Sequence, residues 1–136
     1  QHGIHGFWES RLPELFFNQY NLVVGKATYI SDPLREAWRI VRSSNRLVDT
    51  VLVMQRKLDS TFRTDQKFEF SKRKNTTLRQ YSAEYSSTYQ RMTNHSVERR
   101  MKASIHSIGS YWLSAWIMAG QPDLTDKDDK KNRLSN

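Results

Sequence analysis

The stretch Asn94–Pro122, NHSVERRMKASIHSIGSYWLSAWIMAGQP, indicates the fold class of this chain. Asn94-His95-Ser96 is typical of a break followed by a new helix cap, and Gly120 followed by Pro122 is a strong stop. Between them the large apolar residues recur every three or four positions, the period of one helix face. They are Val97, Met101, Ile105, Ile108, Trp112, Leu113 and Trp116. The stretch therefore predicts one long apolar helix.

A second long helix is predicted upstream, with its start at Ser31-Asp32-Pro33. A capping side chain there precedes a proline whose fixed φ and missing N–H suit the first helical turn. Apolar residues again form a stripe, arginines occupy the other faces, and the helix is expected to end near Asp59 to Phe62. The stripe is Leu34, Ala37, Trp38, Val41, Val48, Val51, Leu52 and Leu58, and the arginines are Arg35, Arg39, Arg42 and Arg46.

The remaining segments are assigned by the same periods. Residues 7–17 have helical spacing that Pro13 is expected to bend or divide, and residues 63–75 lack a sustained period and are predicted to be a loop. From Thr77 another helix is predicted, because aromatic residues recur at threes and fours: Leu78, Tyr81, Tyr85, Tyr89 and Met92. Such a stripe favours packing in a core over stacking on nucleic-acid bases.

The fold class predicted from these segments is all-α, a bundle of about four helices. Residues 1–124 form the helical part, and the tail at 125–136 is expected to be disordered because it is charged and has one large apolar residue, Leu134. A chain of 136 residues that is 37% hydrophobic can build one domain core. No apolar run approaches the roughly 18 residues of a membrane span, so no transmembrane segment is expected.

Charge and cysteine content limit the chemistry. The formal charge of +8 would attract polyanions such as nucleic acid or anionic lipid headgroups. The chain has no cysteine, so any metal site must use His, Asp, Glu or backbone groups. For each basic cluster, including Lys72-Arg73-Lys74, the ordinary interpretation is a solvated surface. His106 is expected to be structural.

His5 and Glu9 form the candidate metal site. Residues four apart lie one above the other on a helix face, so a helix would stack these two side chains. An imidazole nitrogen and a carboxylate oxygen are both good zinc donors, and three protein ligands with an open position make a catalytic zinc site. The pair is therefore half of such a site.

The segment Gly3-Ile4-His5-Gly6-Phe7-Trp8-Glu9 resembles the Gly-x-His-x-x-aromatic-Glu segment of the zinc-dependent phospholipase C family. The fungal and plant single-strand-specific zinc nucleases share that fold and have a similar His-x-x-Trp-Asp segment. The longer match is to the bacterial branch of this superfamily and covers roughly the chain up to Leu124. Its carrying segments are His2–Leu15, Val97–Met101 and Ala119–Leu124, of which the first is the specific one.

The resemblance implies that His5 and Glu9 bind one of three zinc ions and that Trp8 packs beside them. His2 receives no ligand role. The family's other ligands, including the amino group of an N-terminal Trp, precede this segment, so the chain is expected to be the C-terminal part of a longer enzyme. The missing N-terminal part of the same polypeptide would complete the site. An extracytoplasmic location, secreted or periplasmic, is implied as well.

The implied function is hydrolysis of a phosphodiester substrate, either a phospholipid or nucleic acid. Glu at position 9 favours the phospholipase branch, whereas the +8 charge would suit a nuclease equally. A lipid enzyme should have an apolar approach to the metals, and a nuclease should have an aromatic platform for bases. The alternative from another class is a non-catalytic basic helical module that binds an acidic partner, in which His5 and Glu9 are incidental.

Overall fold

The computed structural model describes residues 4–73 and 75–124, and the predicted tail and His2 lie outside these ranges. The chain begins with a short helical segment in four pieces. They are α1 (Ile4–Gly6), the π-helical turn η1 (Phe7–Arg11), α2 (Leu12–Phe16) and the 3₁₀ turn η2 (Phe17–Gln19). An extended stretch without helix or strand, residues 20–30, then leads to the next helix.

The predicted helix from Pro33 is divided into α3 (Pro33–Asn45) and α4 (Val48–Asp59). Asp32 caps α3, because its side chain accepts a hydrogen bond of 2.9 Å from the Arg35 backbone N–H. The expected start and end are therefore confirmed, whereas the interruption at residues 46–47 was not predicted. The apolar pattern is the same on both sides of this break, so the pattern could not locate it.

The all-α prediction is wrong, since the fold is mixed. A short helix α5 (Thr64–Lys67) leads into strand β1 (Phe68–Arg73), which pairs antiparallel with β2 (Thr76–Tyr81). The register places Phe68 opposite Tyr81 and Lys72 opposite Thr77. The loop predicted at residues 63–75 is thus wrong for residues 64–73, and the helix predicted from Thr77 begins only after Tyr81.

The helix was predicted to begin too early because Tyr81 ends the strand and Tyr85 lies in the first turn of the helix that follows. Ser82 caps α6 (Ala83–Met92) by accepting a hydrogen bond from Tyr85 N–H, so the helix cannot begin earlier. Tyr81 ends β2 and stacks on Tyr85, with ring centroids 4.9 Å apart. The strand end and the first helical turn face the same core, and their side chains imitate helical spacing across the junction.

The long helix α7 (Ser96–Met118) confirms the prediction from its sequence. It follows Asn94 and His95, which both have positive φ, and it ends before Gly120, whose φ of +82° favours glycine. Its N-terminal half meets the core, because Val97 is buried and Met101 packs against the buried cluster.

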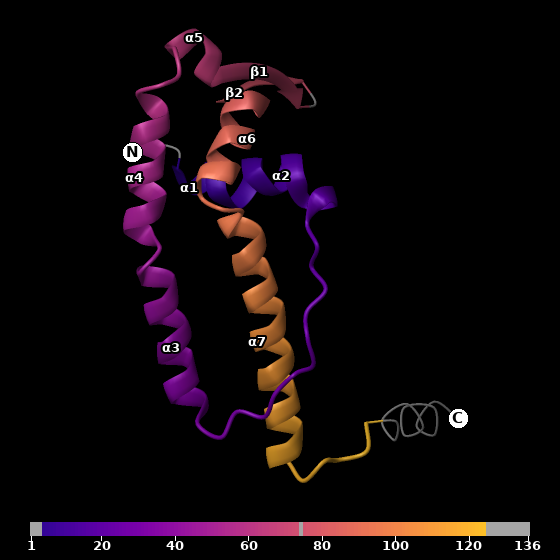
Figure 1. The fold of residues 1–136 in the computed structure, drawn as a ribbon. Coiled ribbons are helices and arrows are strands. Elements are labelled where there is room, and N and C mark those ends of the chain that lie inside the picture. The colour runs from indigo at the N-terminus through magenta and orange to yellow at the C-terminus, as the bar shows by residue number, and fades with distance from the viewer. Residues whose placement is uncertain (1–3, 74, 125–136) are drawn as a thin grey trace, which may run out of the picture.

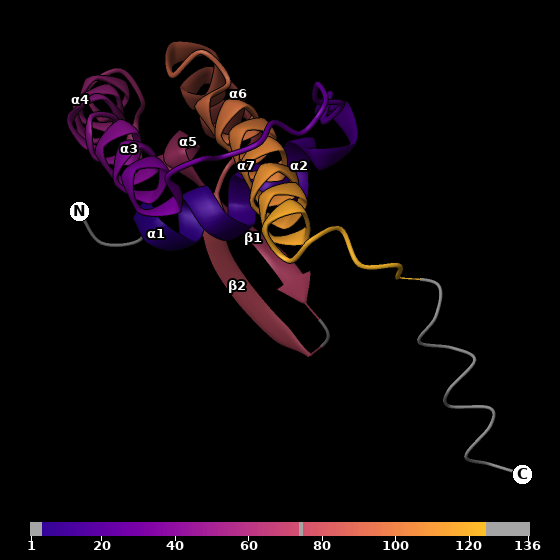
Figure 2. The ribbon, with the colours of Figure 1, turned by 90° about the horizontal axis from the view of Figure 1, so that it is seen from below.

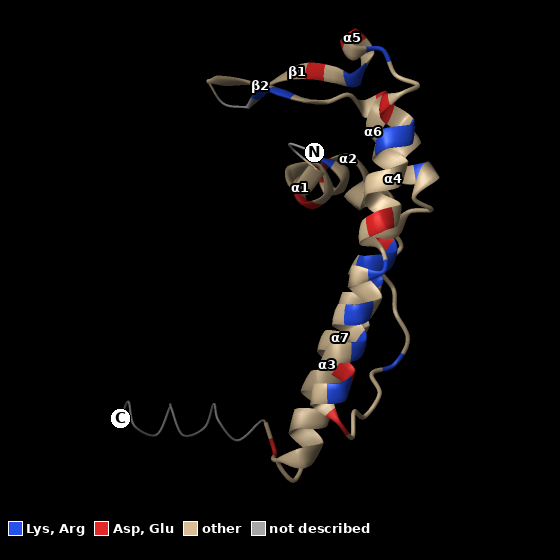
Figure 3. Cartoon of the chain, turned by 90° about the vertical axis from the view of Figure 1, so that its left-hand side faces the viewer, with Lys and Arg blue, Asp and Glu red and all other residues tan. Residues whose placement is uncertain are grey.

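The helices form two antiparallel columns, α3 with α4 and α6 with α7 (Figure 1). Seen from below, the columns lie side by side (Figure 2). The Ile4–Gln19 segment crosses them on the side toward which the β1–β2 hairpin projects (Figure 3). Between the lower halves, Tyr111 Oη donates to the Pro33 carbonyl at 2.7 Å.

The buried core lies near the hairpin and the N-terminal segment, away from the lower ends of the columns. It consists of Phe7, Leu12, Leu58, Tyr81, Tyr85, Tyr89 and Val97. The expected core role is confirmed for Tyr85 and Tyr89, which are fully buried, whereas Leu78 of the same predicted stripe is exposed. Within α3, all of which is described, no residue is buried, and Trp38 is 56% exposed. Within the described ranges, no helix is both long and apolar enough to cross a membrane.

Candidate metal centre

His5 and Glu9 face the same side of the N-terminal segment and contact each other. His5 Nε2 lies 3.1 Å from Glu9 Oε2, and the two side chains are 84% and 65% exposed. Two ligands of one tetrahedral zinc ion, at ordinary bond lengths, lie about 3.4 Å apart. The two atoms therefore have almost the separation that a shared ion requires. Because both side chains are exposed, an ion between them could accept further ligands.

Pro13 explains the unusual turn that carries Glu9. A proline has no N–H, so it cannot donate to the carbonyl four residues back, which is that of Glu9. The chain responds with a wider turn, in which the Leu12 N–H donates to the Phe7 carbonyl five residues back. Single π turns of this kind are frequent at functional sites. The local sequence thus gives Glu9 an irregular backbone beside the candidate ligand His5.

Trp8 is fixed by a chain of hydrogen bonds that reaches across the molecule. Its Nε1 donates to the Tyr89 hydroxyl at 2.9 Å, and that hydroxyl donates to the Val51 carbonyl at 3.0 Å. Burial, the largest cause, raises the pKa of Tyr89 to about 12, so its hydroxyl keeps its proton at neutral pH. The ring next to the candidate ligands is consequently held in one place.

Phe7, the neighbour of Trp8 in the sequence, belongs to the core and not to the cavity at His5 and Glu9. It is 2% exposed and packs into the core, with its ring centroid 4.4 Å from that of Tyr81 and 5.1 Å from that of Tyr89. Of Phe7 and Trp8, it is Trp8 that lines the cavity containing His5 and Glu9. Phe7 instead anchors the turn on which the pair stands.

A largely apolar cavity of about 420 Å³ borders the pair. Ile4, His5, Trp8 and Glu9 form one wall. The opposite wall comes from the end of α3 and the first half of α4, where Val48, Val51 and Leu52 supply the apolar surface. Because α4 lies about forty residues away in the sequence, local spacing could not have predicted this wall.

Arg100 of α7 is the cation of this cavity, a role that the sequence reasoning missed. No carboxylate among the described residues lies within ion-pair distance of it. Its Nη2 donates to Ser44 Oγ at 2.7 Å and its Nη1 to Ser43 Oγ at 3.4 Å. A guanidinium has five N–H donors, so this anchoring leaves donors free for an oxyanion.

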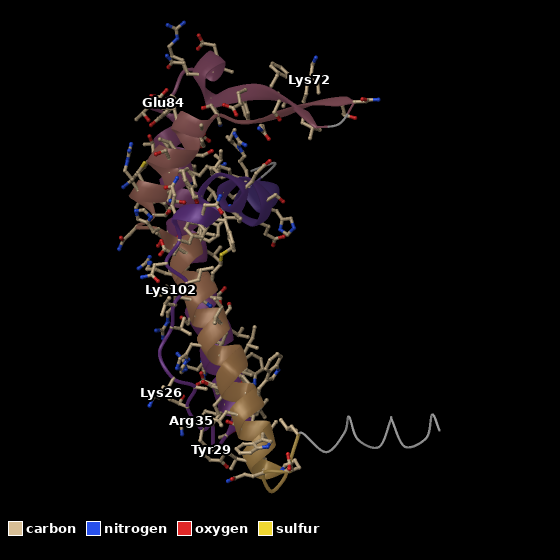
Figure 4. The ribbon with its side chains drawn as sticks, turned by 90° about the vertical axis from the view of Figure 1, so that its right-hand side faces the viewer. Lys26, Tyr29, Arg35, Lys72, Glu84 and Lys102 are labelled. Atoms are coloured by element: carbon tan, nitrogen blue, oxygen red, sulfur yellow. The ribbon has the colours of Figure 1, made fainter. Side chains whose placement is uncertain are left out.

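His95, His106 and Lys72 of the hairpin lie outside this cavity. His106 lines a different cavity, and His95 Nδ1 is 3.9 Å from Glu98 Oε2 on its own helix. Lys72 lies on β1, in the hairpin (Figure 4). No group of three or more His, Cys, Asp or Glu residues in the described part of the chain could hold a metal ion. The described residues therefore fit one edge of a zinc site, and further ligands would have to come from elsewhere.

Comparison with models of known protein families, with curated proteins and with solved structures found no match for this chain.

Proposed function

We propose that this chain is the C-terminal part of a zinc-dependent phosphodiester hydrolase of the phospholipase C type, in which His5 and Glu9 bind one ion of a multinuclear zinc site. The observation that carries the proposal is the 3.1 Å contact of His5 and Glu9 at the rim of an apolar cavity. The resemblance of the Gly3–Glu9 segment to that family supports the same reading of the pair.

The residues of the cavity suit the substrate in distinct ways. Bound zinc would supply a water molecule activated for attack and would neutralise charge on the phosphoryl oxygens. Arg100 would donate hydrogen bonds to a phosphoryl oxygen, and Trp8 with Val51 would exclude water around it. A guanidinium suits a phosphate because its fork of N–H groups matches the oxygens.

The apolar walls favour a phospholipid over nucleic acid as substrate. Val48, Val51 and Leu52 offer contact to hydrocarbon, and they offer no hydrogen bond to a base. Trp8 is the aromatic group of this cavity, but its indole N–H is already bonded to Tyr89. A nuclease would be expected to present an exposed stacking surface at this place.

The test compares Glu9→Gln with Glu14→Gln in the full-length protein. Both glutamates lie in the N-terminal helical segment, but Glu14 does not line the cavity and is paired with Arg11 at 3.6 Å. We expect Glu9→Gln to lower zinc content and hydrolysis of bis-p-nitrophenyl phosphate together, and Glu14→Gln to leave both unchanged. Unchanged zinc content and hydrolysis in Glu9→Gln would refute the proposal.

A second comparison tests the substrate class. Val48→Asp places a charge on the apolar wall, at a residue that is 48% exposed and therefore tolerant of a polar side chain. Hydrolysis of phosphatidylcholine should fall at least about tenfold, a difference of about 1.4 kcal/mol in the barrier, while hydrolysis of bis-p-nitrophenyl phosphate stays near the parent value. Equal loss on both substrates would argue against a lipid-binding role of this wall. Residues 1–136 alone should be nearly inactive.

A further inference from the structure

A second cavity, of about 590 Å³, lies between α3, α7 and the segment Thr28–Asp32. None of the residues that line it lines the cavity at His5 and Glu9. Arg35, Arg39 and Arg42 reach it from α3, and His106, Ser107 and Ser110 reach it from α7. It is polar where the first cavity is apolar, so the two would select different ligands.

The three arginines lie on one side of α3 because they are spaced by four and then three residues. Figure 3 shows basic residues repeated along this column, and Figure 4 places Lys26, Arg35 and Lys102 along one side of the molecule. The rise of an α-helix puts Arg35 and Arg42 about 10 Å apart along the axis. A cavity between them can therefore expose one anion to guanidinium groups from two turns of the helix.

The carboxylates of the cavity are already engaged. Glu36 accepts two hydrogen bonds from Arg39, from Nε at 2.7 Å and from Nη2 at 2.5 Å. This contact with Arg39 lowers the pKa of Glu36, and Asp32 is bonded to the Arg35 backbone N–H. The lining has three arginines against two carboxylates, an excess of one positive charge among these groups.

Arg35 and Arg42 are the donors that remain available. Among the residues that the structure describes, neither has a carboxylate within ion-pair distance. Arg39 is paired with Glu36, which lies three residues earlier on the same helix. Two free guanidinium groups beside a fixed ion pair are an arrangement that a doubly charged oxyanion would complete.

The opposite wall is held in place without a ligand. Ser110 Oγ accepts from Thr28 N–H at 3.1 Å, and Ser114 Oγ accepts from Ile30 N–H at 2.7 Å. His106 Nε2 lies 3.1 Å from the Lys26 carbonyl, which can only accept, so this nitrogen carries the proton. The extended segment is thus fixed along α7, which lowers the cost of ordering it when a ligand binds.

We propose that this second cavity binds a phosphate group, with Arg35 and Arg42 as its principal donors and the hydroxyl groups of Thr28, Ser31 and Ser107 as neighbouring donors. The phosphate could belong to a free anion or to a lipid headgroup. The donors come from two helices and a third segment that surround one cavity, which suits a small free anion better than a flat bilayer surface, so the free anion is the expected source. The site is separate from the proposed zinc centre and does not depend on it.

The experiment is a calorimetric titration of the chain with inorganic pyrophosphate at low salt. We expect saturable binding that Arg35→Gln and Arg42→Gln each weaken at least about tenfold, as expected for loss of a charge-assisted hydrogen bond. Arg56→Gln is the matched control, because Arg56 is an exposed arginine of α4 that lines neither cavity. Its affinity for pyrophosphate should stay within about twofold of the parent value.

Three outcomes would overturn the proposal: no binding of pyrophosphate by the parent chain, equal weakening by Arg56→Gln and Arg35→Gln, or binding only to vesicles of phosphatidic acid in phosphatidylcholine. The last outcome would assign the arginines of α3 to a membrane surface. Circular dichroism of each variant verifies that the helices are retained. Since the three substituted side chains are exposed, loss of folding is not expected.

Discussion

Trp8 and Tyr89 are 81 residues apart, yet the indole N–H of one donates to the hydroxyl of the other at 2.9 Å. The same hydroxyl donates to the Val51 carbonyl, so the turn beside His5, helix α6 and helix α4 meet at one oxygen atom. Tyr89 is fully buried, and water cannot replace either bond. This oxygen therefore connects the candidate metal ligands to the core.

Tyr89→Phe should destabilise the chain by about 1–3 kcal/mol, because the partly buried Trp8 N–H loses its acceptor and the Val51 carbonyl loses the hydroxyl as a donor. The midpoint of urea unfolding would measure the loss. Tyr29→Phe is the control. Tyr29 is 52% exposed, and loss of its hydroxyl should change the free energy of unfolding by less than about 0.5 kcal/mol. Equal stability of the two variants would show that the Tyr89 hydroxyl is not a structural link.

Arg11→Met should loosen the hairpin from the N-terminal segment. Arg11 is 8% exposed, its Nε donates to the Tyr81 carbonyl at 3.0 Å, and its Nη2 pairs with Glu69 at 2.5 Å. We expect a loss of about 2 kcal/mol in unfolding free energy, since Glu69 is partly exposed and can regain water. The exposed pair of Arg63 with Asp65 offers the control, and Arg63→Met should cost less than about 0.5 kcal/mol.

His5→Ala should leave the free energy of unfolding almost unchanged. The contact with Glu9 is between two exposed side chains, and such pairs contribute less than about 1 kcal/mol. Thermal or urea unfolding of the metal-free chain would measure this. A large loss of stability would mean that the pair supports the fold, and it would weaken the case that these residues are kept for binding.

Alkaline pH should destabilise the chain between about pH 10 and 12. Burial raises the pKa of Tyr89 to about 12, and burial together with the Glu98 carboxylate raises that of Tyr20 to about 12, from the ordinary value of 10.0. Burial also raises the pKa of Tyr85, to which the hydrogen bond with Asp59 contributes. The folded state keeps these protons while the unfolded state releases them from about pH 10, so stability falls as pH rises through this window.

The measurement is tyrosinate absorbance recorded with circular dichroism during the same titration. Tyr85 and Tyr89 should ionise only as the helices unfold. If all six tyrosines titrated near pH 10 in a chain that stayed helical, the burial of Tyr85 and Tyr89 would be refuted.

The helices were predictable where local signals agree. Asp32 with Pro33 located the start of α3, and Gly120 located the end of α7, because caps and stops depend on the backbone nearby. The hairpin escaped prediction because Tyr81 and Tyr85 have helical spacing although one belongs to a strand. A continuous helix and a strand followed by a helix can both give this spacing, and only the tertiary structure shows which of the two is present.

The candidate site was predictable to the same local extent. The spacing of His5 and Glu9 predicted that they would be stacked, and they lie in contact. Arg100 and the α4 wall could not be predicted, since they reach the pair through the packing of segments that are distant in sequence. Arg100 belongs to the Val97–Met101 segment, which shares the resemblance to the phospholipase C family, but that segment does not predict a contact with the cavity.

The π turn at Phe7–Arg11 sets the angular phase between the two ends of the N-terminal segment. Each residue of an α-helix advances the side chains by about 100°, so the wider turn offsets His5 and Trp8 relative to Leu12. Pro13 keeps this wider turn in place, because its missing N–H rules out an ordinary α-helical bond to the Glu9 carbonyl. A single backbone irregularity thus aligns the ligand face with the packing face of the segment.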